Sequence, residues 1–154
     1  MTPSPSDTHH KNKTFFGKYR GTVSNNIDPQ GLGRLQVAVP SVLGPAANAW
    51  AMPCLPIAGP QAGILALPPI GASVWVEFEA GDPGSPIWVG GFWPQAGEMP
   101  QMQPDPASAA LMLSAGGASL VIDRNGIALR SGGGASITLQ GPEVSVNAGA
   151  LVVV

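Results

Sequence analysis

The sequence predicts an all-β protein in which a small barrel or sandwich is followed by a repetitive β region that needs other copies of the chain. Three observations support this prediction. The 154 residues include 21 Gly and 17 Pro, which interrupt the chain too often for long helices. Short segments with alternating apolar residues fill the first part of the chain. Apolar pairs at spacing two, separated by Gly-rich turns, fill the last part.

Charged residues are scarce. The chain has 7 Lys and Arg against 9 Asp and Glu, which is 10% of its residues, whereas soluble domains carry about 25%. We therefore expect other chains to cover part of the surface. The net charge of −2 means that the chain lacks the positively charged surface with which proteins bind nucleic acid.

The sequence contains no predicted targeting or membrane segment. The first residues lack the apolar region of a signal peptide, and no apolar run is long enough to span a bilayer. We therefore expect synthesis in the cytoplasm.

Residues 1–14 have the polar composition of a flexible N-terminal arm. His9 and His10 lie in this arm without further ligand types nearby, so we predict no metal site there. A second interpretation is that the arm becomes ordered on a partner above the barrel. The contacts to such a hub protein would then be Lys11, Lys13, Phe15 and Phe16.

Residues 15–94 are predicted to form the barrel or sandwich. In the segment 74–79, Val74, Val76 and Phe78 share one face, which we expect to pack into the core. Asp28-Pro29-Gln30-Gly31 has the residues of a type I turn. The single cysteine, Cys54, is expected to be a small buried residue. The predicted strands cover 18–24, 34–40, 50–54, 63–68, 73–79 and 86–92.

Residues 95–108 are predicted to be an extended Pro-rich linker. The segment 107–115 fits either a helical turn or the start of a strand. Residues 109–154 contain the apolar pairs, each too short to form a stable core within one chain. We expect a β-helix or β-prism in which several chains place these residues inside. The predicted core residues of this shaft are Leu120, Ile122, Ile127, Leu129, Ile137, Leu139, Val144 and Val146.

Four segments together resemble a known family. They are the turn region 21–33, the segment WAMPC at 50–54, Pro69-Ile70-Gly71 before VWVEFE, and GDPGSPIWVG at 81–90. Over residues 16–93 the chain resembles the OB-fold domain of phage baseplate assembly protein V and of cell-puncturing tail spikes. Vgr spike proteins of type VI secretion share this domain. The region 111–154 is similar to the intertwined trimeric β-helix of those spikes.

This resemblance implies an N-terminal OB-fold barrel followed by a C-terminal intertwined trimeric β-helix or β-prism. It implies a homotrimeric, non-enzymatic spike of a contractile injection machine, which joins a baseplate hub and contacts the target membrane only transiently. It also implies a PAAR-type tip protein on the last strand, and it leaves room for an effector cargo. We expect no catalytic residues, cofactor or metal. The predicted tip contacts are Leu151, Val152, Val153 and Val154.

Two other functions remain open at this point. OB folds often bind oligosaccharides or oligonucleotides through aromatic side chains. A stacking platform of Tyr19, Trp75, Trp88 and Trp93 would make the barrel a module that recognises an oligosaccharide or cell-wall polymer. The C-terminal repeat could instead belong to a receptor-binding fibre, although such fibres usually end in a globular head.

Overall fold

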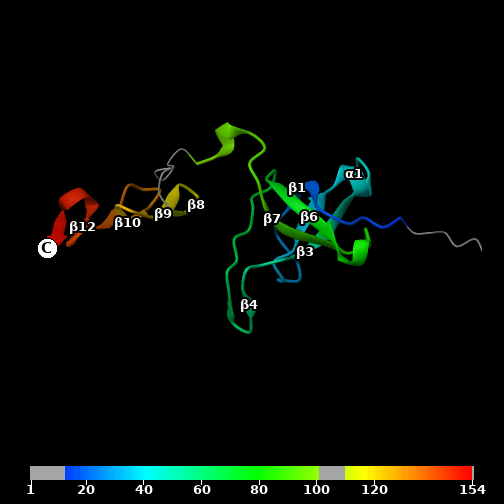
Figure 1. The fold of residues 1–154 in the computed structure, drawn as a ribbon, viewed down its shortest axis with the longest axis horizontal. Helices are drawn as coiled ribbons and strands as arrows, with labels where there is room; N and C mark the ends of the chain where they lie inside the picture. Colours follow the sequence, from blue (N-terminus) through cyan, green and yellow to red (C-terminus); the bar gives the residue numbers. More distant parts are fainter. Residues whose placement is uncertain (1–12, 101–109, 154) are drawn as a thin grey trace, which may run out of the picture. The chain divides into compact units, whose positions relative to one another are not determined.

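The computed structural model describes residues 13–100 and 110–153. It divides into two compact units, the first ending at Pro94 and the second beginning at Gln95. The predicted arm, apart from residues 13 and 14, and residues 101–108 of the predicted linker lie outside the described residues. Each unit is described by itself below (Figure 1).

The first unit is a closed barrel with the strand order β1-β2-β3-β7-β6. Neighbouring strands are antiparallel except β3 and β7, which are parallel. This five-stranded barrel has the OB-fold architecture, and five of the six predicted strands are present. Their bounds are β1 Tyr19–Asn25, β2 Leu35–Ala38, β3 Asn48–Pro53, β6 Ser73–Phe78 and β7 Pro86–Gly91.

The barrel core comes from strict alternation along the strands. On β6, Val74, Val76 and Phe78 are buried while the residues between them are partly exposed, as predicted. Alternate residues of β2 behave in the same way. The buried apolar cluster consists of Val23, Leu35, Val37, Val39, Ala51, Val74, Val76, Phe78 and Trp88. Because these side chains converge from all five strands, the barrel has a core of its own within one chain.

Short elements connect the strands. The helix α1 (Pro40–Leu43) follows β2, and the 3-10 turn η1 (Glu79–Gly81) lies between β6 and β7. The strand predicted at 63–68 is wrong beyond its first residue, because only β4 (Ala58–Gly59) and β5 (Ala62–Gly63) pair there. Residues 64–68 include Pro68, whose nitrogen cannot donate to a ladder, and no described strand pairs with them.

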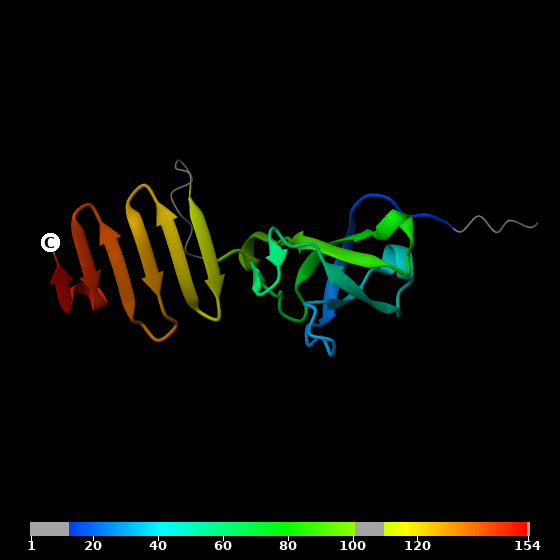
Figure 2. The ribbon, with the colours of Figure 1, turned by 90° about the horizontal axis from the view of Figure 1, so that it is seen from below.

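The second unit begins with the 3-10 turn η2 (Ala96–Glu98), so the start of the predicted linker is not uniformly extended. It then forms one six-stranded antiparallel sheet in which each strand pairs with the next in sequence (Figure 2). The undecided segment 107–115 is a strand from Leu111 onward. The sheet comprises β8 Leu111–Ala115, β9 Ala118–Asp123, β10 Gly126–Arg130, β11 Ser136–Gln140, β12 Glu143–Val146 and β13 Leu151–Val153, with the 3-10 turn η3 (Asn147–Gly149) before β13.

The turns of this sheet explain the uneven spacing of the repeat. Gly116 and Gly117 form a two-residue turn with φ values of 58° and 80°, the combination that a type I′ hairpin requires. Gly141, with φ of 56°, begins an equally short turn before Pro142. The connections after β10 and β12 are longer. Mixed turn lengths keep the strands in register although the steps between apolar pairs differ.

The prediction for Cys54 is wrong. Its side chain is exposed, while its backbone N–H donates to the Trp88 carbonyl oxygen at 2.9 Å. The residue follows β3 directly, where the chain leaves the barrel. Its backbone is therefore tied to the parallel neighbour strand although its thiol faces outward.

Candidate trimerisation surface

The C-terminal sheet carries two unbroken apolar rows on one face. Residues paired across an antiparallel ladder lie on the same side of a sheet, so the register defines each row. One row runs Leu111, Ile122, Ile127, Leu139, Val144 and continues in register to Val153. The other runs Leu113, Leu120, Leu129, Ile137, Val146 and Leu151. We call these two rows together the apolar face; it includes all eight residues predicted as the shaft core.

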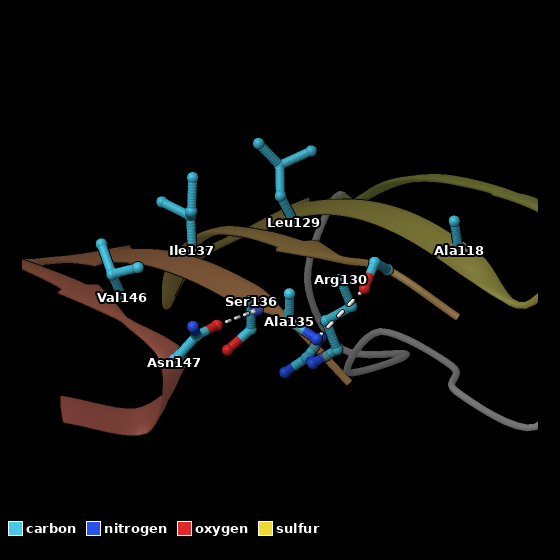
Figure 3. A pocket seen from close by; sticks show the side chains of 9 residues that line it. Ala118, Leu129, Arg130, Ala135, Ser136, Ile137, Val146 and Asn147 are labelled. Atoms are coloured by element: carbon cyan, nitrogen blue, oxygen red, sulfur yellow. Dashed lines mark hydrogen bonds between the residues drawn. The ribbon is translucent and has the colours of Figure 1, made fainter. Parts of the chain in front are cut away.

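Much of the apolar face is uncovered in the single chain. Leu129 is 44% exposed and Ile137 is 40% exposed, although both lie in the middle of the sheet. Leu129, Ile137 and Val146 point to the same side of the sheet (Figure 3). Together with Ala118 they line a shallow hollow of about 460 Å³. Contiguous exposed apolar surface of this kind marks an interaction site. One copy of the sheet cannot bury it.

Charged residues occur only on the other side of this sheet or in its turns. Asp123, Arg130 and Glu143 occupy strand positions that alternate with the apolar rows, and Arg124 lies in the turn between β9 and β10. The second face also holds a buried residue that the spacing of apolar pairs does not predict, Val121, which is 8% exposed. The sheet therefore has one uncharged face and one mixed face.

Glycine permits the close approach of strands in this sheet. An added Cβ at Gly126, where φ is 134°, would lie 1.9 Å from the carbonyl oxygen of Leu139. No side chain can occupy that space. At the η3 turn, the Ser136 backbone N–H donates to Oδ1 of Asn147 at 3.0 Å (Figure 3), which ties the start of β11 to the turn after β12.

The last strand is a sheet edge. β13 pairs with β12 through Val144, Ser145 and Val146, and no described strand pairs with its outer side. Leu151 is 59% exposed. Of the predicted tip contacts, Leu151, Val152 and Val153 thus belong to an open edge strand, and Val154 lies outside the described residues.

The loop between β1 and β2 is closed by one carboxylate. Asp28 accepts hydrogen bonds from the backbone N–H groups of Gln30, Leu32 and Arg34 at 2.8 to 3.2 Å. It also accepts from Nε and Nη2 of the Arg34 guanidinium at 3.1 and 2.7 Å. The guanidinium, aided by the backbone donors, holds the pKa of the Asp28 carboxyl well below its usual range against the opposing effect of burial. The predicted turn is present, since the Gly31 N–H donates to the Asp28 carbonyl oxygen.

The predicted hub contacts separate into different environments. Phe15 packs its ring against Tyr19 and Phe78, and its N–H donates to the Gly81 carbonyl oxygen at 2.8 Å. Phe16 is 70% exposed. Lys13 Nζ lies 5.2 Å from the centre of the Phe15 ring, and Lys11 is outside the described residues. Phe15 therefore belongs to the barrel, whereas Phe16 is available to a partner.

The four predicted platform aromatics do not gather into one surface. Trp88 is buried in the barrel core, where its Nε1 donates to the Gly33 carbonyl oxygen at 3.2 Å. Tyr19 packs against the core. Trp75 lies against Phe92 with Arg20 over both rings, and Trp93 is exposed. Trp50, which was not among the predicted platform aromatics, lies under the guanidinium of Arg34 at 5.2 Å from its ring centre.

The described residues include neither a metal-binding cluster nor a membrane-spanning helix. No group of three or more His, Cys, Asp or Glu side chains in 13–100 and 110–153 is arranged to hold a metal ion. Among the same residues, no helix has the length and apolar character needed to cross a membrane.

Comparison with known families decides what the two units are. Residues 19–93 match the type VI secretion system/phage-baseplate injector OB domain, and residues 101–152 match the phage baseplate V C-terminal trimerisation domain. The chain belongs to the phage baseplate V family. It is a baseplate V-type injector spike protein, and this spike family is typically non-enzymatic. No curated protein matches the chain.

The match places the apolar face within the trimerisation domain. The six strands of this baseplate V protein lie almost entirely within the trimerisation domain. The predicted all-β class, with an OB barrel followed by a C-terminal β region, is confirmed. The barrel buries its own core, whereas the trimerisation domain leaves its apolar rows exposed.

Proposed function

We propose that three copies of the chain assemble into a homotrimeric central spike by packing their apolar faces together. The observation that carries this proposal is the pair of unbroken apolar rows across all six strands. Each sheet supplies one wall of a triangular prism, with the rows inside and Asp123, Arg130 and Glu143 outside. The trimerisation domain match supports three as the number of walls.

This arrangement suits a device that transmits force. Strands in a sheet are about 4.8 Å apart, so six strands extend roughly 24 Å in the direction of their hydrogen bonds. In the proposed prism this direction is the spike axis. A load along the axis then acts on the hydrogen bonds between strands and on the apolar rows packed inside the prism. Compression of the spike would break these hydrogen bonds and packing contacts, so both resist it. We propose that sheath contraction drives this prism through the target envelope.

The two ends of the spike would contact different partners. The open outer edge of β13 is an exposed row of backbone donors and acceptors, which proteins normally cover. We propose a PAAR-type tip protein as the cover, with Leu151, Val152, Val153 and Val154 as its contacts. At the barrel, exposed Phe16 with Lys13 and Lys11 of the N-terminal arm would contact the hub protein.

The trimer is tested by placing a charge on the apolar face. Leu129→Asp should convert the full-length protein from three chains to one in light scattering, because three carboxylates cannot be buried together without partners. Thr138→Asp is the matched control: it lies on the adjacent strand and faces the other side. It should leave the trimer intact. A parent protein with the mass of one chain would refute the proposal.

The tip contact needs a separate measurement. A purified PAAR-repeat protein of the same injection system should bind the trimer with one tip per three chains in native mass spectrometry. Leu151→Asp should abolish this binding, while Thr138→Asp should leave it unchanged. A trimer that does not bind the tip protein would contradict this contact but would not contradict the proposed trimer.

A further inference from the structure

An apolar hairpin projects from the barrel between β3 and β6 (Figure 1). This hairpin, residues 55–68, contains β4 and β5, and the Ile64 N–H donates to the Ile57 carbonyl oxygen at 3.1 Å. Leu55 at its start packs against the barrel core, but most of its other large apolar side chains face solvent. Those of Ile57, Ile64, Leu65 and Leu67 are 42% to 57% exposed.

The hairpin has a defined conformation and a defined neighbour. Gly63 has little space for a side chain, since a Cβ there would lie 3.0 Å from the Ile57 carbonyl oxygen. At its base, Nδ2 of Asn26 donates to the Pro68 carbonyl oxygen at 3.0 Å. A Cβ at Gly33 would lie 3.4 Å from Cδ1 of Leu65. The hairpin is therefore held beside the loop between β1 and β2, which adds exposed Ile27 and Leu32 to the same region.

The hairpin and the chain on both sides of it carry no charge, and Asp28 and Arg34 of the neighbouring loop form a largely buried ion pair with each other. From Leu35 to Val76 the chain contains no Asp, Glu, Lys or Arg. Near a threefold axis each side chain meets two copies of itself, so a charge there would face like charges. The apolar face of the trimerisation domain is uncharged in the same way. Surfaces that bind unrelated partners have no such requirement, and they usually have a polar, solvent-accessible rim.

We infer that the hairpin of each copy packs against the barrel of a second copy, near the threefold axis of the spike. This inference rests on the proposed homotrimer. Trimerisation would hold the three barrels together through the segment 95–109, which raises their effective concentration enough for a modest apolar contact to form. Permanent homo-oligomer interfaces are more apolar than transient ones, in agreement with the composition of the hairpin. The alternative partner for the hairpin is the hub protein.

Thiol labelling can distinguish these occupants in the full-length protein. Cys54→Ser removes the only cysteine, and Leu65→Cys then places a reporter in the hairpin. Ser41→Cys, at an exposed position of α1, provides the matched control. Maleimide labelling rates are measured for each reporter in the trimer and in a protein that also carries Leu129→Asp. Light scattering gives the mass of every sample before labelling.

The Leu65→Cys reporter should label at least tenfold more slowly in the trimer than in the Leu129→Asp protein, while Ser41→Cys labels equally in both. Equal rates for Leu65→Cys in samples of three chains and of one chain would overturn the inference, since the hairpin would then be open to a different protein such as the hub. A mass of one chain without Leu129→Asp would refute the trimer itself. The mass from light scattering therefore distinguishes failure of the hairpin contact from failure of the proposed trimer.

Discussion

Gly126 on β10 lies directly against the backbone of Leu139 on β11, so that even a methyl group at position 126 would overlap the Leu139 carbonyl oxygen. The left-handed φ of 134° at Gly126 adds a second reason for glycine. Because Leu139 belongs to one of the apolar rows, this backbone contact helps to set the register of the face.

Gly126→Ala should therefore disrupt the C-terminal sheet. The overlap cannot be relieved by a side-chain rotation, and we expect a loss of at least about 3 kcal/mol in the free energy of unfolding. Gly133→Ala, in a nearby loop with only the Ser131 hydroxyl at 3.9 Å, should change stability by less than about 1 kcal/mol. Urea unfolding followed by circular dichroism measures both. Equal effects of the two substitutions would show that the close contact at Gly126 is unimportant.

Truncation of the apolar rows should weaken the trimer in a graded way. Leu129→Ala and Ile137→Ala each remove a side chain from the face, and buried truncations of this kind cost about 2–5 kcal/mol. Because the trimer dissociates on unfolding, the melting temperature should rise with protein concentration and should be lower in both variants. Thr138→Ala, between the rows and on the other face, is the control. A melting temperature independent of concentration would contradict the trimer.

Phe15→Ala should destabilise the barrel, whereas Phe16→Ala should not. Phe15 packs edge-on to Tyr19 with ring centres 6.1 Å apart, and its loss should cost about 2–4 kcal/mol. Phe16 is mainly solvated, so its removal should remain within about 0.5 kcal/mol. All four tryptophans lie in the barrel unit, so tryptophan fluorescence during urea unfolding reports on this unit. The reverse order of the two effects would exclude Phe15 from the barrel core.

Acid should weaken the barrel through Asp28. The pKa of this carboxyl is lower in the folded than in the unfolded protein. Its contribution to the free energy of unfolding is therefore complete above the unfolded pKa of about 3.9 and is lost as the pH falls below that value. Asp28→Asn should be less stable than the parent at pH 7. Its free energy of unfolding should fall less than that of the parent between pH 5 and pH 3. Glu79→Gln, at an exposed carboxylate of η1, should keep the parent's pH dependence. Identical pH profiles for Asp28→Asn and the parent would refute this role.

Much of the architecture could be predicted from local patterns. The alternation in 74–79 identified the core face of β6 because the strand is half buried and side chains alternate across it. The apolar pairs predicted the residues of the two apolar rows for the same reason. The strand expected at 63–68 failed because its apolar run is not covered by the barrel, and hydrophobicity alone does not distinguish a core strand from an exposed interface segment.

The sequence by itself determined the all-β class and the residues of the apolar rows, because these follow from turn chemistry and from a period of two along each strand. Only the tertiary structure decided which pairs face each other, because register depends on turn lengths and on contacts such as that between Gly126 and Leu139. It also decided that Phe15 packs in the barrel, that Cys54 is exposed, and that Asp28 closes a loop with Arg34. The first two outcomes depend on contacts with segments that are remote in the chain, and the third depends on how the loop between β1 and β2 folds. An alternation pattern along a strand encodes none of these contacts.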